Sequence, residues 1–141
     1  VAVSPNCSNV IPETVVFTVD VRDKREEKIK SFVDEIGVIA ERITEERGTA
    51  CRIKHIADSR PFRMDGRIVS LMQGLAERAG ISHQIMDSGA VHDTCMIAPH
   101  APSGMLFVPS LGGRSHMPLE DTNRDDLVKG AQLLLDTVLN L

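Results

Sequence analysis

The sequence contains no long apolar run, no cluster of basic residues and no paired cysteines, and each absence excludes a class of protein. No stretch reaches the roughly 18 apolar residues that a membrane-spanning helix needs, and no basic-then-apolar segment of a secretory signal is present. The 16 Lys and Arg residues stand against 20 Asp and Glu residues, giving a net charge of −4. Because nucleic-acid binding requires a concentrated basic face, we expect small-molecule or protein partners instead, with no nucleic acid and no membrane.

The cysteines indicate the redox environment of the chain, and the first residue indicates that it is part of a longer protein. Cys7, Cys51 and Cys95 are odd in number, widely spaced and form no CxxC pair, so neither a disulfide framework nor a cysteine zinc site is expected. This pattern favours a reducing cytoplasm. The chain begins with Val1 where an intact gene product normally has Met, so we expect it to be a piece of a longer protein.

Hydrophobic periodicity predicts alternating strands and helices. Apolar residues alternate in some segments, as in a half-buried strand, and recur at spacings of three and four in others, as in an amphipathic helix. We expect strands at 15–21, 51–57, 82–86 and 104–110, and helices at about 24–47, 67–79, 92–98 and 121–141. The inward faces of the three longer helices are predicted to carry Ile29, Phe32, Val33, Ile36, Ile39 and Ile43, then Ile68, Leu71, Leu75 and Ala79, then Leu127, Ala131, Leu134, Leu135 and Val138.

This order of elements predicts an α/β fold. A length of 141 residues fits one ordinary domain or two small lobes, and 42% hydrophobic with 26% charged residues is typical of a folded chain. We expect two lobes that meet at the turn around Pro61.

Two histidines stand out because each follows or precedes the same apolar strand. His92 lies in "SGAVHD" and His116 in "GGRSH", on either side of the predicted strand 104–110. A histidine in such a loop can bind a metal, act as a base or simply hydrogen-bond at the surface. The sequence has no HExxH motif and no third well-placed histidine, because His55, His83 and His100 are expected to be ordinary surface or half-buried residues. Either there is no metal site here, or the other ligands lie outside the chain.

Arg22 and Asn9 are weaker candidates. Arg22 shares a face with Asp20, so it could bind a substrate carboxylate through two parallel hydrogen bonds or simply pair with Asp20. Asn9 could donate or accept a hydrogen bond at the same site, or serve as an Asx-type turn residue. The residues alone leave both alternatives open.

Three longer blocks, taken in order, carry a resemblance to a known family. "PNCSNVIPETVVFTVDVRD", "SGAVHDTCMIAPHAPSGMLFVPS" and "GGRSHMPLEDT" followed by "LVKGAQLLLDTVL" resemble the carboxy-terminal part of zinc-dependent amidohydrolases. These include N-carbamoyl-L-amino-acid hydrolase, allantoate amidohydrolase and beta-alanine synthase. The resemblance implies that residues 1–61 form the second half of an α+β lid that also makes a homodimer. Residues 62–141 would then supply the carboxy-terminal strands and helices of an α/β catalytic domain.

The same resemblance implies roles for individual residues. His116 matches the last metal ligand of the family, and His92 matches a substrate-contacting histidine close to the reacting group. Asn9 and Arg22 match the lid residues that bind the carboxylate end of the substrate. Val91 replaces the glycine usual before the histidine, which implies a narrower pocket or altered specificity.

The function implied is metal-assisted hydrolysis of a ureido or N-carbamoyl C–N bond in a carboxylate-bearing substrate. Two divalent ions, Zn or Mn, would activate a water while a Glu shuttles the proton. The remaining metal ligands and this Glu belong to the family's amino-terminal half, which these residues do not include. A non-catalytic fragment that keeps the fold, dimerisation or carboxylate binding is the alternative, and a related aminoacylase or peptidase is a further one.

Overall fold

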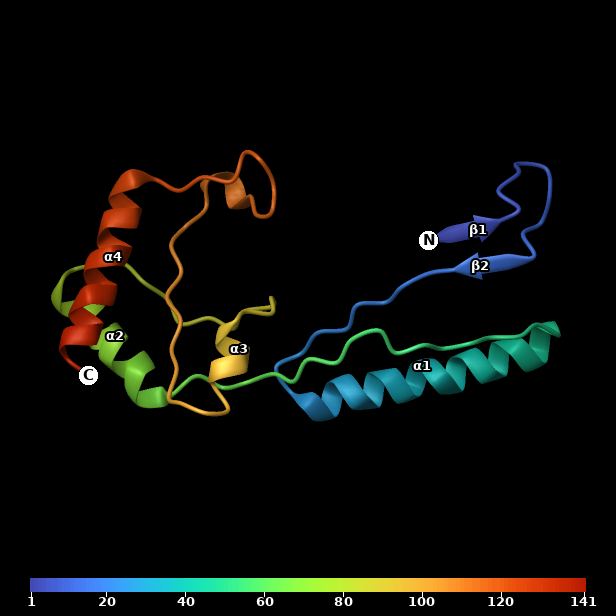
Figure 1. Cartoon of the computed structure of the whole chain (residues 1–141), viewed down its shortest axis with the longest axis horizontal. Helices are drawn as coiled ribbons and strands as arrows, with labels where there is room; N and C mark the ends of the chain where they lie inside the picture. Colours follow the sequence, from blue (N-terminus) through green and yellow to red (C-terminus); the bar gives the residue numbers. More distant parts are fainter. The chain divides into compact units, whose positions relative to one another are not determined.

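The computed structural model describes all 141 residues and divides them into two compact units, Val1–Asp58 and Ser59–Leu141. The first unit has a hairpin and one helix and the second has several helices, and both contain extended segments (Figure 1). The only paired strands are a short antiparallel sheet in the first unit, so the chain mixes helix with little sheet. None of the helices combines the length and apolarity needed to cross a bilayer.

The first unit consists of a hairpin and one long helix. β1 (Ala2–Ser4) pairs with β2 (Thr14–Val16) in the register Val3 opposite Val15. α1 (Glu26–Arg47) has acids in its first turn, which suit the positive end of a helix, and ends at Gly48 with φ of 61°. Residues 49–58 then run back along α1 as an extended segment (Figure 1).

The second unit is built on two packed helices, α2 (Gly66–Arg78) and α4 (Arg124–Leu139). Asp65 caps α2 by accepting hydrogen bonds from the backbone of the first turn, and Asn123 caps α4 in the same way. The short α3 (Thr94–Ile97) and a single 3₁₀ turn, η1 (Leu111–Gly113), lie in the connection between them.

An extended segment, residues 103–108, packs against both α2 and α4. Ser103 accepts a hydrogen bond from the Asp65 backbone N–H at 2.8 Å. A Cβ atom on Gly104 would lie 2.6 Å from Ile68 of α2, and one on Gly130 would lie 2.5 Å from Val108. Only glycine permits such close approaches, so both positions let the segment pack directly on the helices.

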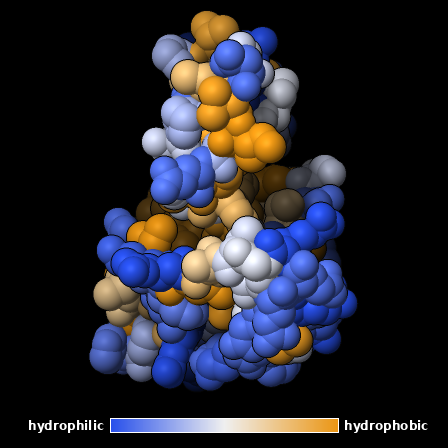
Figure 2. All heavy atoms as spheres, turned by 90° about the vertical axis from the view of Figure 1, so that its right-hand side faces the viewer, coloured by the Kyte–Doolittle hydropathy of each residue, from blue (hydrophilic) through white to orange (hydrophobic).

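The packed centre of the chain is small. Its buried residues are Ala76, Ser103, Leu133 and Thr137, all in the second unit. Hydrophobic side chains elsewhere remain open to solvent, as the patches in Figure 2 show. The exposed area is 11,928 Å², whereas a monomeric protein of this mass exposes about 7,200 Å².

The predicted helices are confirmed, but the predicted strands largely are not. Of the first expected strand, 15–21, only Val15 and Val16 are paired, and residues 51–57, 82–86 and 104–110 are extended without strand pairing. A strand is stabilised by hydrogen bonds to a neighbouring backbone. The chain offers no such neighbour to these three segments.

The predicted inward face of α4 is wrong. Its expected residues Leu127, Ala131, Leu134, Leu135 and Val138 are exposed, and α4 instead buries Leu133 and Thr137, with Gly130 against Val108. At position 130 only glycine fits, because an added Cβ would lie 2.5 Å from Val108. The α1 face is only partly covered as well, since Phe32, Ile39 and Ile43 are exposed.

Candidate functional site

His92 lies two residues before α3, beside a shallow depression in the second unit. The depression has a volume of about 420 Å³ and is lined by His92, Asp93, Thr94, Gly104, Met105, Leu106, Phe107 and Leu134. Its floor is the 103–108 segment, so the packing of that segment on α2 and α4 positions the histidine. A half-buried imidazole in a mostly apolar depression is suited to contact a small ligand.

Two neighbours contact the His92 ring. Ser88 Oγ lies 2.7 Å from His92 Nε2, and the Phe107 ring lies with its centroid 5.3 Å away at an angle of 57°. The sequence did not single out either residue. Ser88 stands four positions before the histidine and Phe107 in an apolar run, which are common contexts with no distinct signal.

His116 lies in a closed surface loop that runs from Leu111 to Asp121. The Leu111 backbone N–H donates to the Asp121 carbonyl at 2.8 Å and closes the loop. Gly112 and Gly113 both have positive φ, which this tight path requires. His116 itself has a φ of 57°, and its backbone N–H donates to Glu120 Oε2 at 2.6 Å.

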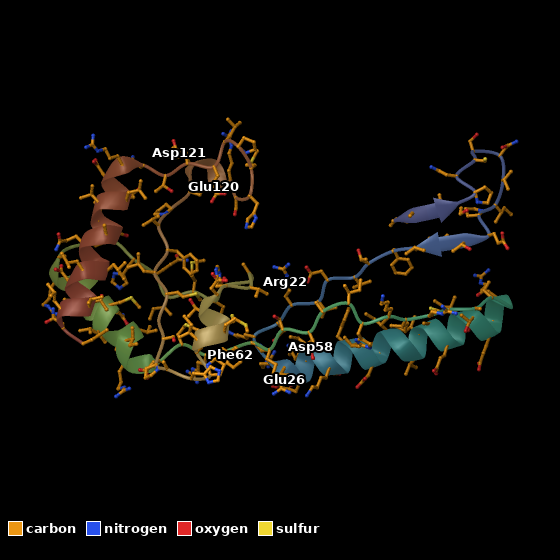
Figure 3. The ribbon with its side chains drawn as sticks, viewed as in Figure 1. Arg22, Glu26, Asp58, Phe62, Glu120 and Asp121 are labelled. Atoms are coloured by element: carbon orange, nitrogen blue, oxygen red, sulfur yellow. The ribbon has the colours of Figure 1, made fainter.

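The acids of this loop do not cap the last helix. Glu120 instead binds the His116 backbone, and the Asp121 carboxylate accepts from the Thr122 backbone N–H. Figure 3 shows both acids in the connection before α4. The cap of α4 is Asn123, so Glu120 serves to fix the backbone that carries His116.

The exposed His116 imidazole could supply one metal ligand, but the chain does not hold a complete site. No group of three or more His, Cys, Asp or Glu side chains is placed to bind a metal ion. No hydrogen bond or ring contact joins His92 to His116. Since a catalytic zinc usually has three protein ligands, the residues present can supply only one ligand of a metal site.

In the first unit, Arg22 pairs with Asp20. Its Nε donates to Asp20 Oδ1 at 3.0 Å and its Nη2 to Oδ2 at 2.6 Å. Arg22 lies in the connection between β2 and α1 (Figure 3). The hydrogen bonds that Arg22 donates to Asp20 hold the pKa of the Asp20 carboxyl below its usual value and raise the pKa of Arg22. Both side chains are more than half exposed, so the pair remains accessible to a ligand.

Asn9 and Val91 lie in exposed loops. Asn9 is in the turn of the hairpin, and its side chain makes no hydrogen bond in the chain, so no Asx turn forms. Val91 is 65% exposed and does not line the depression beside His92. Its expected effect on a pocket stays a prediction.

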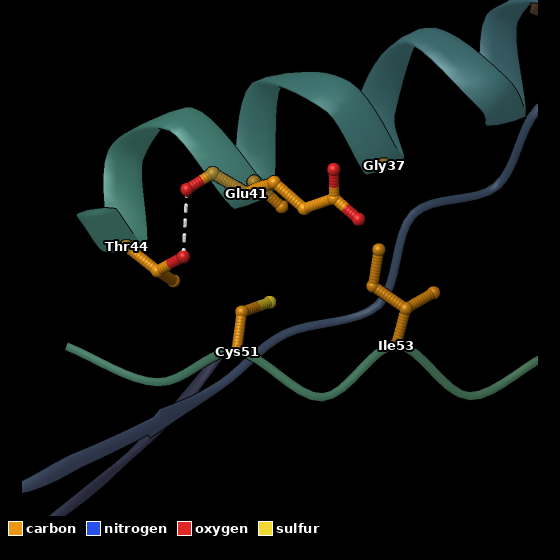
Figure 4. Close-up of a pocket in the computed structure, with 6 residues that line it drawn as sticks. Gly37, Glu41, Thr44, Cys51 and Ile53 are labelled. Carbon is orange, nitrogen blue, oxygen red and sulfur yellow. Dashed lines mark hydrogen bonds between the residues drawn. The ribbon is translucent and has the colours of Figure 1, made fainter. Parts of the chain in front are cut away.

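A second hollow, of about 250 Å³, lies between α1 and the returning segment (Figure 4). It is lined by Gly37, Ala40, Glu41, Thr44, Cys51 and Ile53. The Thr44 hydroxyl donates to the Glu41 carbonyl at 2.8 Å, a common local bond within helices. This hollow is a packing gap over the glycine of the helix, and none of the predicted site residues lies in it.

Comparison with known proteins decides the family. Residues 5–140 match the family described as peptidase family M20/M25/M40. The chain belongs to this family. The resemblance seen in the sequence blocks is confirmed, since the similar proteins include carbamoyl-amino-acid and allantoate amidohydrolases.

The matches to individual relatives include nearly all of this chain but only about a third of each relative. It is 39% identical over 136 residues to an N-carbamoyl-L-amino-acid amidohydrolase of Rhizobium meliloti, covering 96% of this chain and 33% of that protein. It is 34% identical to an allantoate amidohydrolase of Escherichia coli K12, covering 92% and 32%. A crystal structure of an amidase of the hydantoinase/carbamoylase family from Burkholderia multivorans has a TM-score of 0.93 and 34% identity, covering 99% and 34%. The M20 chain thus spans about a third of the length of the relatives it matches.

Proposed function

We propose that the protein containing this chain hydrolyses a non-peptide C–N bond in a carboxylate-bearing substrate, such as an N-carbamoyl-L-amino acid or allantoate. The observation that carries the proposal is the likeness over the full chain, at a TM-score of 0.93 and 34% identity, to an amidase of the hydantoinase/carbamoylase family. Relatives named for N-carbamoyl-L-amino acids and for allantoate support the same substrate class.

In this proposal His116 contributes one ligand to a pair of divalent ions, zinc or manganese, completed by residues of the rest of the protein. When bound, such ions act as Lewis acids toward the carbonyl group that is hydrolysed. The chain's own part is to hold the ligand: the bond from the His116 backbone to Glu120 fixes the loop while leaving the imidazole exposed. His92 lies beside the reacting group and donates a hydrogen bond to the substrate.

Arg22 and Asn9 recognise the carboxylate end of the substrate. Arg22 already holds a carboxylate, that of Asp20, through two parallel hydrogen bonds, which is the geometry proposed for the substrate. The unpaired Asn9 amide adds a further donor. Residues 1–61 then form part of a lid that also makes a homodimer, and residues 62–141 part of the catalytic domain of a cytoplasmic enzyme.

A second candidate is that the chain by itself is non-catalytic and retains only the fold, dimerisation or carboxylate binding. The absence of any three-residue metal-binding group in the chain favours this reading for the isolated segment. An aminoacylase or peptidase activity is the further alternative within the same family, and its substrates belong in the test.

The test is hydrolysis by the intact protein of a substrate panel in the presence of zinc or manganese. N-carbamoyl-L-amino acids and allantoate are compared with N-acetyl-L-amino acids and dipeptides. The proposal expects hydrolysis of the first two classes, at rates well above those for the others. Preference for acetylated amino acids or dipeptides would replace it with the aminoacylase or peptidase reading.

A further inference from the structure

The backbone of His116 has a conformation that only glycine adopts readily. Its φ is 57°, and no other residue of the chain except glycines has a positive φ. In this left-handed region Cβ lies too close to the following carbonyl oxygen, which is costly for any side chain. Such residues persist only where their surroundings hold them, and they gather at functional sites. The contacts of His116 therefore show what stabilises this conformation.

One hydrogen bond supports the His116 backbone. Its N–H donates to Glu120 Oε2 at 2.6 Å, and His116 makes no other hydrogen bond in the chain. The direction of this bond is fixed, because a backbone N–H can only donate and a carboxylate can only accept. Bonds to a charged acceptor are also stronger than those between neutral groups. Glu120 is therefore the group that stabilises His116 in the left-handed region.

Glu120 is itself placed by the closure of the loop. Its backbone N–H donates to the Met117 carbonyl at 2.9 Å, and the Leu111 N–H donates to the Asp121 carbonyl at 2.8 Å. These bonds join backbone groups alone, so they depend on no ligand. Glu120 binds the backbone of His116 and not its ring, so both ring nitrogens are left for an ion.

We propose that Glu120 is a positioning residue, which raises metal affinity at His116 by holding this backbone in place before an ion binds. The inference rests on the proposed function, in which His116 supplies a metal ligand. If the left-handed conformation were only a small part of the population, the apparent metal affinity would fall in proportion to that part. The bond to Glu120 keeps the binding conformation dominant in the metal-free protein.

The first test is the backbone of His116 in the intact protein prepared without metal. A crystal structure of this protein should show a positive φ at His116 and the bond from its N–H to the Glu120 carboxylate. This result requires no variant to fold. A negative φ at His116, or the absence of the bond to Glu120, would overturn the proposal.

The second test is the zinc affinity of variants, measured on the metal-free intact protein in competition with a chelator. Glu120→Ala should weaken binding of the ion held by His116 about tenfold or more, as expected when a group that orients a ligand is lost. Glu120→Gln should recover most of the affinity, because its amide oxygen still accepts. Asp121→Ala is the matched control and should leave the affinity unchanged, since the Asp121 carboxylate binds only the Thr122 backbone.

The outcomes separate the positioning role from the proposed function. Equal zinc affinity in Glu120→Ala and the unmodified protein would reject the positioning role. An equal loss of affinity in Asp121→Ala would assign the effect to the charge of the loop and would also reject it. A protein with the expected affinities that hydrolyses none of the substrate panel would instead reject the proposed function alone.

Discussion

At the scale of single residues, Arg22 already binds a carboxylate before any substrate is present. Asp20 occupies its Nε and Nη2 groups, but both side chains are more than half exposed. An exposed ion pair of this kind contributes little to stability, because water screens it and two side chains must be ordered. A substrate carboxylate can therefore take the place of Asp20 at low cost.

Replacing Arg22 with Ala should raise KM for carboxylate-bearing substrates about tenfold or more, since a charge-assisted bidentate contact is lost. Arg22→Lys should recover only part of this, because an ammonium group lacks the planar fork. The matched control is Arg67→Ala, since Arg67 also pairs with an acid two residues before it, Asp65. Steady-state kinetics measure the effect, and a KM unchanged in Arg22→Ala would reject carboxylate recognition.

Asp65 gives a pH-dependent prediction. Hydrogen bonds from the Arg67 side chain and backbone lower its pKa, so the folded state favours the charged carboxylate. Its contribution is complete above the unfolded pKa and is lost as the pH falls through the lower folded value, below about pH 4. Asp65→Asn should keep an acceptor at the start of α2 while removing this pH dependence. Thermal unfolding measured from about pH 2 to about pH 7 would show the difference between the two proteins. An equal acid dependence in both proteins would contradict the assignment.

The residue scale also shows what the sequence could and could not predict. His92 and His116 stand out because they lie in loops on either side of the same apolar segment, 104–110. Ser88 does not, because its 2.7 Å contact with His92 crosses a turn that no spacing rule specifies. The pairing of Arg22 with Asp20 was one of two readings of the pattern, and the structure shows the pair without testing the other role.

At the scale of elements, two glycines determine how the second unit packs. Gly104 and Gly130 allow residues 103–108 to lie directly on α2 and α4. The helices themselves were predictable, because their hydrogen bonds are local and their apolar spacing is visible in the sequence. The extended segments were predicted as strands and remain unpaired, because strand formation depends on neighbours that the sequence pattern does not reveal.

Gly104→Ala and Gly130→Ala should each destabilise the protein, because the added Cβ would lie about 2.6 and 2.5 Å from Ile68 and Val108 respectively. Overpacking of this kind costs about 1–3 kcal/mol. Gly74→Ala is the control: it lies within α2, its Cβ would meet only Arg78 at 3.6 Å, and it should stabilise by up to about 1 kcal/mol. Denaturant unfolding measures all three. Equal stability of the Gly104 and Gly74 variants would contradict the close packing.

At the scale of the whole molecule, the chain leaves most of its hydrophobic side chains uncovered. Exposed apolar residues occupy one face of α4, half of the apolar face of α1 and the extended segments. The chain also spans only about a third of the length of its relatives. The excess area over the about 7,200 Å² expected for this mass is surface that a stable protein would bury.

The 141-residue chain produced by itself should therefore bind a hydrophobic dye and form assemblies larger than a dimer, whereas the intact protein should bind no dye and form only the proposed homodimer. Dye fluorescence and sedimentation of both preparations measure dye binding and association. In the isolated chain, Leu134→Glu changes an exposed apolar position of α4 and should lower dye binding. A monomeric isolated chain with no dye binding and a sharp unfolding transition would contradict the prediction.

The measurement that tests the central claim most directly is the metal content of the intact protein with and without His116. His116→Ala should lose about one of two divalent ions and nearly all hydrolysis of N-carbamoyl-L-amino acids or allantoate, because one ligand is removed. His100→Ala, at another exposed loop histidine, should keep both. Full metal occupancy in His116→Ala, measured by elemental analysis, would contradict the account.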